Sequence, residues 1–110
     1  MSRRTEKVAA LLHQEVGSFL LQLELPVLTT ISKVEVTPDL KWAKVWITIM
    51  GDEKQHEEVL AVLFEHKREL QDELIDKLSM KIVPRIKFVV DRAEEYAAHI
   101  NELIRKTHEQ

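Results

Sequence analysis

The fold is decided by the stretch VEVTPDLKWAKVWITI, residues 34–49. From residue 42 the side chains alternate, with Ala43, Val45, Ile47 and Ile49 on one face and Trp42, Lys44, Trp46 and Thr48 on the other. A period of two over eight residues is typical of a half-buried strand. The preceding Thr37-Pro38-Asp39 favours a turn, because proline pre-sets φ and aspartate can bond the backbone just downstream. The stretch therefore predicts two antiparallel strands joined by a turn.

Outward from this hairpin, apolar spacing predicts the other elements. An apolar stripe at intervals of three and four predicts a first helix from about Arg4 to Gln22, which Pro26 ends. A strand follows over about 31–36, and the hairpin's second strand runs to about Met50. Asp52 is a candidate N-cap for the next helix. That helix is either one of about 25 residues or two helices with a kink near 66–68. A third strand is expected over 85–90 and a last helix over 93–105, with a frayed tail over 107–110.

The helical stripes also predict which side chains are buried. The first helix would bury Val8, Leu11, Leu12, Val16, Phe19, Leu20 and Leu23. The second helical region would bury Val59, Leu60, Val62, Leu63, Phe64, Leu70, Leu74, Ile75 and Leu78. Because neither strands nor helices carry a second apolar surface, they must cover each other. The prediction is an α+β domain of two layers, in the order α-β-β-α-β-α, with a three-stranded sheet packed on helices.

Length and composition set outer limits. We expect the 110 residues to form a single domain spanning 1–110, with a folded core over about 4–105. The chain has no cysteine, which excludes disulfides and thiolate metal sites. No apolar run reaches membrane-spanning length, and the first four residues are not followed by a signal-type apolar core. These features predict a cytoplasmic protein without a membrane partner.

Charge is unevenly distributed along the chain, although the net charge is only −3. Residues 52–76 contain nine acidic and three basic residues, a balance of −6, whereas residues 77–92 contain five basic and one acidic, a balance of +4. Lysine and arginine bind phosphate without reading sequence. Candidate RNA-binding side chains, which from charge alone could equally be ordinary solubilising charges, are Arg3, Arg4, Lys7, Lys41, Lys44, Lys67, Arg68, Lys77, Lys81, Arg85 and Lys87. The acidic segment should face away from the RNA or toward a protein.

Four stretches, taken in order, resemble the ribosome-binding factor A family. The most specific is the hairpin itself, 34–40 followed by 43–45. The others are Leu70, Glu73 and Leu74; the segment 82–84 with Ile86, Lys87, Phe88 and Asp91; and Glu95, Tyr96, Ala98, Ile100, Glu102 and Leu103. With the first helix, the resemblance covers about residues 4–105.

The resemblance implies a type II KH-like domain. Such a factor binds the immature small ribosomal subunit and its rRNA, promotes late rRNA processing and maturation, notably in the cold, and is not an enzyme. Ribosomal proteins or other assembly factors are further possible partners, and a monomer is expected.

Two departures from the family pattern are visible, and one feature of many KH domains is missing. Where the family has a small-residue kink, this chain has His66, Lys67 and Arg68. Val27 follows Pro26 in place of a basic residue. With glycine only at 17 and 51, the glycine loop by which many KH domains clamp single-stranded RNA is absent.

Two other functions stay open at this point. A protein-interaction module could use the acidic helix face with Trp42 and Trp46, and it would bind independently of salt. The two tryptophans could equally be covered by helices or pack across strands. An enzyme would need the carboxylates of Asp72, Glu73 and Asp76 to lie in a cleft that separates their pKa values. The histidines show no metal-type spacing. No catalytic residue, metal site or cofactor is predicted.

Overall fold

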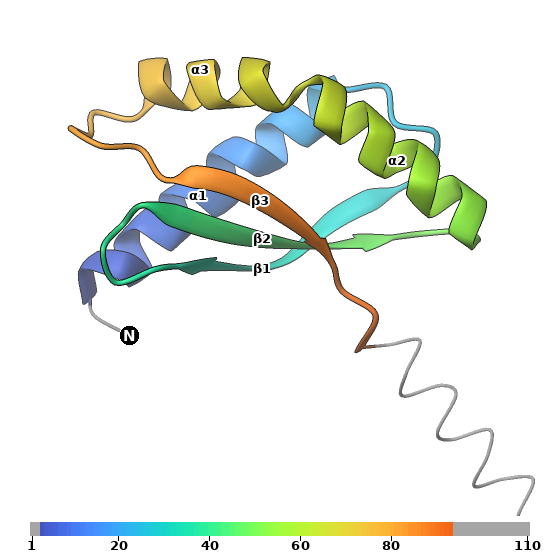
Figure 1. Cartoon of the computed structure of the whole chain (residues 1–110), viewed down its shortest axis with the longest axis horizontal. Helices are drawn as coiled ribbons and strands as arrows, with labels where there is room; N and C mark the ends of the chain where they lie inside the picture. Colours follow the sequence, from blue (N-terminus) through green and yellow to red (C-terminus); the bar gives the residue numbers. More distant parts are fainter. Residues whose placement is uncertain (1–2, 94–110) are drawn as a thin grey trace, which may run out of the picture.

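The computed structural model describes residues 3–93 (Figure 1). Its elements are α1 (Arg3–Gln22), β1 (Thr29–Val36), β2 (Trp42–Ile49), α2 (Glu53–Glu65), α3 (Lys67–Lys77) and β3 (Arg85–Val90). The strands form one sheet in the order β1-β2-β3, with β1 antiparallel and β3 parallel to β2. The α+β fold, the hairpin and the bounds of the third strand are confirmed. The predicted helix over 93–105 and the tail over 107–110 lie outside the described residues.

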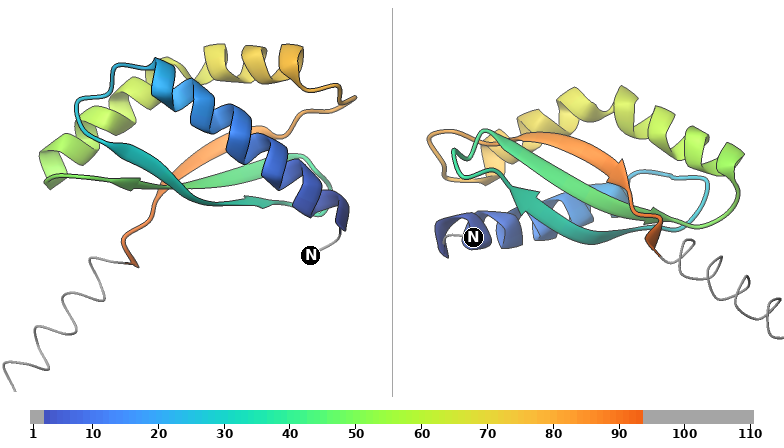
Figure 2. Two further views of the ribbon diagram at one scale, coloured as in Figure 1. Left: turned by 180° about the vertical axis from the view of Figure 1, so that it is seen from behind. Right: turned by 60° about the horizontal axis from the view of Figure 1, so that its bottom comes forward.

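All three helices lie on one face of the sheet (Figures 1 and 2). Helix α1 packs on β1, α2 on β2, and α3 contacts both β3 and α1. Beneath them, β2 contributes Ala43, Val45, Ile47 and Ile49 to the core, all buried as the alternation predicts. The opposite face of the sheet is not covered by any described helix, as the right-hand view of Figure 2 shows.

Helix α2 begins with a complete capping box. The Asp52 carboxylate accepts a hydrogen bond from the Gln55 backbone N–H at 2.9 Å, and the Gln55 side chain accepts one from the Asp52 N–H at 2.9 Å. Each bond satisfies a donor that the helix itself leaves free. The predicted N-cap is therefore confirmed.

The long helical region is broken at His66, so the kinked alternative is the correct one. His66 has φ −96° and ψ 8°, outside the helical region, and it separates α2 from α3. No residue at 66–68 favours a break by its own propensity. The break lies between Leu63 and Leu70, both of which remain buried.

Three predicted core positions are wrong. Leu11, Phe64 and Ile75 are 45%, 78% and 55% exposed. Each stands next to a leucine that is buried: Leu12, Leu63 and Leu74. Successive helical residues point about 100° apart, so one of each pair must leave the core when the buried stripe is narrow. The first strand also begins at residue 29 rather than 31, because residues 29 and 30 pair with 49 and 48.

Candidate nucleic-acid interface

The turn that joins β1 to β2 fixes the start of the candidate surface. The Leu40 N–H donates to the Thr37 carbonyl at 2.8 Å, closing a four-residue turn. The Asp39 carboxylate accepts from the Thr37 hydroxyl at 2.6 Å and from the Lys41 N–H at 3.0 Å. These two bonds lower the pKa of Asp39. They set the position at which Lys41 and Trp42 leave the turn.

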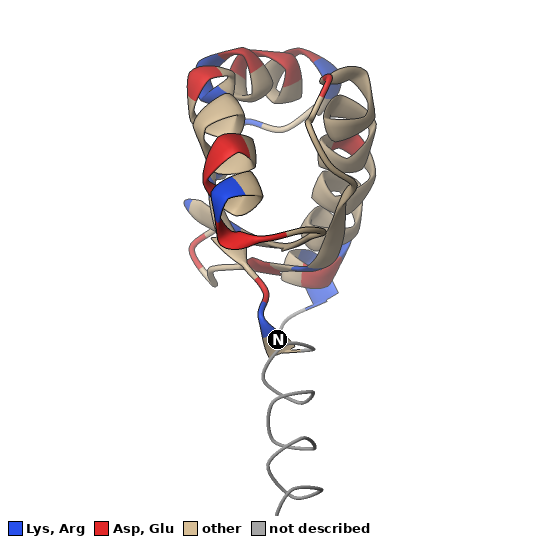
Figure 3. Cartoon of the chain, turned by 90° about the vertical axis from the view of Figure 1, so that its right-hand side faces the viewer, with Lys and Arg blue, Asp and Glu red and all other residues tan. Residues whose placement is uncertain are grey.

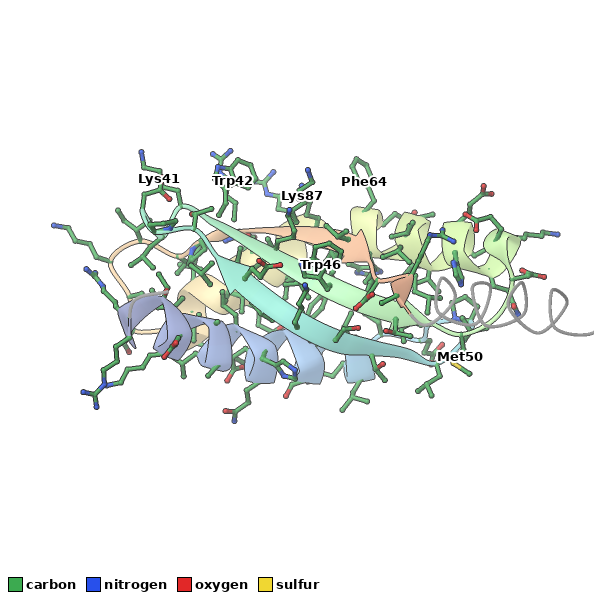
Figure 4. All side chains as sticks on the ribbon, turned by 90° about the horizontal axis from the view of Figure 1, so that it is seen from below. Lys41, Trp42, Trp46, Met50, Phe64 and Lys87 are labelled. Atoms are coloured by element: carbon green, nitrogen blue, oxygen red, sulfur yellow. The ribbon has the colours of Figure 1, made fainter. Side chains whose placement is uncertain are left out.

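Strand pairing then places basic residues side by side on the uncovered face of the sheet. The register of β2 and β3 sets Trp42 opposite Arg85 and Lys44 opposite Lys87. All four side chains are exposed, and Trp42 and Lys87 extend along the β3 edge in Figure 4. Because β2 and β3 are parallel strands from distant parts of the sequence, this grouping depends on the fold.

A second basic group lies where α2 meets α3. Lys67 and Arg68 line a hollow of about 430 Å³ together with Trp42, Phe64 and Arg85. The acids Glu65 and Asp72 also line this hollow, so its charge is mixed. Both cations belong to the first turn of α3, directly after the break at His66, and they share the hollow with Arg85 of β3.

A third group surrounds the start of α1. Arg4 and Lys81 share a hollow of about 600 Å³ with Pro38, Asp39 and Leu40. Arg3 and Lys7 are exposed on the same end of α1, and Lys41 extends from the hairpin turn (Figures 1 and 4). The structure therefore places all of the predicted cations except Lys77 in one of three groups.

Lys77 occupies a different setting from the other predicted cations. Its ammonium lies 2.9 Å from a Glu73 carboxylate oxygen and 3.7 Å from one of Glu15. The bond to Glu73, with the nearby charge of Glu15, raises the pKa of Lys77. It is the only predicted cation that forms an ion pair within residues 3–93.

One residue of this surface, Lys33, was missing from the sequence prediction. Its ammonium lies 4.5 Å from the centre of the Trp46 ring, and that of Lys44 lies 5.6 Å from it. The Trp46 Nε1–H donates to Glu35 at 2.6 Å. Alternation from Val34 and Val36 places Glu35 on the outward face. At Lys33, however, the pairing of β1 with β2 is interrupted by an irregularity between Ile31 and Lys33.

The tryptophans are not covered by described helices, and each faces a side chain of a neighbouring strand, Lys33 of β1 for Trp46 and Arg85 of β3 for Trp42. Trp42 is 46% exposed, while Trp46 is half-buried under its two lysines. Of the two alternatives that the sequence left, cover by helices is therefore excluded within residues 3–93, whereas packing against neighbouring strands is observed for both rings. In the same range, no group of three or more histidine and acidic side chains could hold a metal ion. No helix there is long and apolar enough to span a bilayer.

Comparison with known families decides the relationship. The family model for ribosome-binding factor A matches residues 4–104. This chain belongs to the ribosome-binding factor A family. It is 40% identical to ribosome-binding factor A of Chloroherpeton thalassium over 114 aligned residues, which cover 99% of this chain and 90% of the relative. It is 39% identical to that of Chlorobium limicola, over 96% of this chain and 92% of the relative.

Solved structures agree on the fold. The crystal structure of ribosome-binding factor A from Thermus thermophilus superposes with a TM-score of 0.70 at 24% identity, covering 81% of this chain and 97% of that one. A homology model of the Thermus thermophilus factor, fitted into a cryo-EM map of its complex with the 30S subunit, gives 0.64 at 26% identity, covering 76% and 91%. These neighbours share the KH-like fold of the ribosome-binding factor A family.

Proposed function

We propose that this chain is a non-enzymatic assembly factor that binds the immature small ribosomal subunit through its rRNA. It promotes late rRNA processing and maturation, notably in the cold, acts in the cytoplasm as a monomer, and is released once the RNA is folded. Membership of a ribosome-binding family and the 30S complex of the Thermus thermophilus relative support this proposal. Ribosomal proteins or other assembly factors are additional partners.

The observation that carries the proposal is the exposed basic surface around the β3 edge. Lys44, Arg85 and Lys87 lie beside one another and form no ion pair within residues 3–93. Cations without a carboxylate partner are available to neutralise phosphates and to release counterions. Such binding holds RNA by its backbone, and the fold supplies the shape that matches the subunit.

Salt dependence tests this mode of binding. Purified protein is sedimented with immature small subunits at increasing salt concentration. We expect affinity to fall steeply, since the logarithm of the binding constant falls by roughly 0.7 to 0.9 per phosphate contact for each tenfold rise in salt. Binding that does not respond to salt would instead favour the protein-interaction module with the same fold.

Reversal of Arg85 and Lys87 to glutamate tests the surface itself. The double variant should bind subunits at least about tenfold more weakly at physiological salt, and the salt slope should drop by roughly 1.4 to 1.8. The single variant Lys87→Glu is compared with Lys54→Glu, which makes the same charge reversal at an exposed position on α2. Circular dichroism verifies the fold, and unchanged co-sedimentation of the folded double variant would remove both residues from the interface.

A further inference from the structure

Trp42 separates two hollows on the molecular surface. The first, of about 500 Å³, lies on the sheet and is lined by Lys44 and Lys87 as well as Trp42. The second, of about 430 Å³, lies toward α2 and α3 and is lined by Lys67, Arg68 and Arg85 as well as Trp42. Cations therefore stand on both sides of one exposed indole ring.

The aromatic surroundings of Trp42 differ from those of Trp46. The Arg85 guanidinium carbon lies 5.9 Å from the Trp42 ring centre, and Phe64, 78% exposed, forms part of the wall of the second hollow. Trp46 is covered by two lysines, and its N–H is occupied by Glu35. Only Trp42 of the two presents a large exposed aromatic surface, and it lines both hollows.

The backbone at Trp42 is held in place before any ligand binds. Its carbonyl accepts from the Thr37 N–H at 2.9 Å, and its N–H donates to the Thr37 hydroxyl at 3.1 Å. The neighbouring strand β3 is fixed by the Arg85 N–H, which donates to the Lys41 carbonyl at 2.9 Å. With the backbone fixed in this way, only the two side-chain torsions of Trp42 remain to be ordered when the ring stacks.

We propose that Trp42 stacks one unpaired base of a single-stranded RNA segment that crosses the β3 edge. The phosphates on one side of this base contact Lys44 and Lys87, and those on the other side contact Lys67 and Arg68. This inference rests on the proposed function and adds the class of RNA. A duplex keeps its bases stacked inside and offers none to an exposed ring, whereas a single strand does. Since every base has a π-face, the site tolerates different sequences.

Fluorescence gives a direct test, because the chain contains only two tryptophans. In a Trp46→Phe variant, Trp42 is the only indole. The probe is a single-stranded oligouridylate of about ten nucleotides, within the range that one domain covers. We expect saturable quenching of Trp42 on titration, and neither quenching nor tight binding with an RNA duplex of the same length. Equal binding of the duplex, or no saturable quenching by the single strand, would overturn the inference.

Substitution gives a second test with end-labelled oligouridylate. Trp42→Ala should lose roughly 5- to 140-fold in affinity, the factor that corresponds to stacking of one base on an aromatic ring. Trp42→Phe should lose less, because it retains a ring. Met50→Ala is the matched control, since Met50 is 56% exposed and lies just beyond the far end of β2 (Figure 4). Wild-type affinity in Trp42→Ala would overturn the inference, and the quenching test still decides if this variant does not fold.

The two proposals can fail separately. Failure of wild-type protein to co-sediment with subunits contradicts the proposed function. If wild-type protein co-sediments but oligouridylate neither binds nor quenches, only the role of Trp42 is contradicted. If Trp42→Ala then loses subunit binding, Trp42 contacts a protein or structured RNA on the subunit instead.

Discussion

At the scale of single residues, the turn at 37–42 shows how local chemistry determines a binding surface. Leu40 has φ of 61°, a left-handed conformation that costs a residue with a Cβ about 1–2 kcal/mol. Its side chain is 8% exposed, so burial in the core helps to offset this cost. Asp39 completes the turn by accepting two hydrogen bonds. A strained leucine and an exposed aspartate thus fix where Lys41 and Trp42 lie.

Asp39 should make the stability of the hairpin depend on pH. Its pKa is lower in the folded chain than the ordinary value of 3.8, through bonds from Thr37 and Lys41. A carboxyl whose folded pKa is depressed stabilises the protein above its unfolded pKa, and this stabilisation is lost as pH falls through the folded value. We expect Asp39→Ala to unfold at lower urea concentration than wild type at pH 7, with the difference shrinking below about pH 3.8.

Asp39→Asn separates charge from hydrogen bonding in the same experiment. The side-chain carbonyl oxygen of asparagine can still accept hydrogen bonds from Thr37 and Lys41, so the turn should persist. This variant should not lose stability through titration of residue 39 as the pH falls. Urea midpoints for the three proteins between pH 7 and about pH 3 measure both effects. An identical pH response of Asp39→Asn and wild type would show that the charge of Asp39 contributes nothing.

Much at the residue scale could be predicted from the sequence, and the errors share one cause. Alternation placed every core residue of β2 correctly, because a strand offers only two faces. A helix offers a continuous circumference, so the edge of its buried stripe depends on what packs against it. Phe64 illustrates this: it extends the apolar pattern from Leu63, yet it points to solvent and lines the hollow beside Trp42.

At the scale of elements, the break at His66 follows from the size of the sheet. A straight helix of 25 residues would be about 37 Å long. The longest strands have eight residues, about 26 Å. With two shorter helices, α2 contacts β2 while α3 contacts β3 and α1, and Leu63, Leu70 and Leu74 all remain in the core. Packing decides the break, which is why the local residues could not show which alternative is correct.

Gly51 is the element-scale position most sensitive to substitution. Its φ is 101°, and a Cβ added there would come within 1.9 Å of the Gln55 side-chain oxygen that caps α2. Gly51→Ala must therefore strain the backbone and displace the capping box. We expect a loss of about 2 kcal/mol in the free energy of unfolding, measured by urea titration.

Gly17→Ala is the matched control for this loss. Gly17 lies inside α1, and a Cβ there would meet Ile31 Cδ1 at 3.9 Å, an ordinary contact. Alanine is favoured over glycine in a helix interior, so this variant should gain about 0.5–1 kcal/mol. Similar losses in both variants would contradict the role given to the positive φ and the capping box.

At the scale of the whole molecule, charge is unevenly distributed over the surface. Acidic residues are numerous on α2 and α3 (Figure 3), whereas the basic surface follows the β3 edge, the start of α1 and the first turn of α3. Phosphate would repel the acidic surface and attract the basic one, so we expect this polarity to orient the chain as it approaches RNA. The near-neutral net charge of −3 conceals this polarity.

Neutralising part of the acidic surface tests the predicted orientation. Glu57 and Glu58 are exposed on α2 and form no ion pair within the described range. Glu57→Gln with Glu58→Gln should leave subunit affinity unchanged or increase it by less than about threefold, because exposed charges beyond roughly 8 Å are screened at physiological salt. A marked loss in co-sedimentation would place a protein contact on this face.

The candidate site was predictable as a set of residues but not as an arrangement. Local composition identified the basic segment from Lys77 onward, yet Lys77 itself is paired with Glu73 and Glu15. The meeting of Trp42 with Arg85, and of Lys44 with Lys87, follows from the parallel register of β2 and β3. The residues next to these positions in the sequence do not encode that register. It depends on how α2 and α3, which connect β2 to β3, pack.

The same parallel pairing has a consequence for the time course of folding. The β1–β2 hairpin closes over a short turn and needs only local contacts, whereas β3 must return after both intervening helices. Contacts between distant residues form later, because the entropy of closing a long loop is lost before they stabilise the chain. A partly folded chain can therefore present Trp42 without Arg85 and Lys87 beside it. Only the fully folded chain would present the complete surface, so a nascent or damaged chain would compete poorly for RNA.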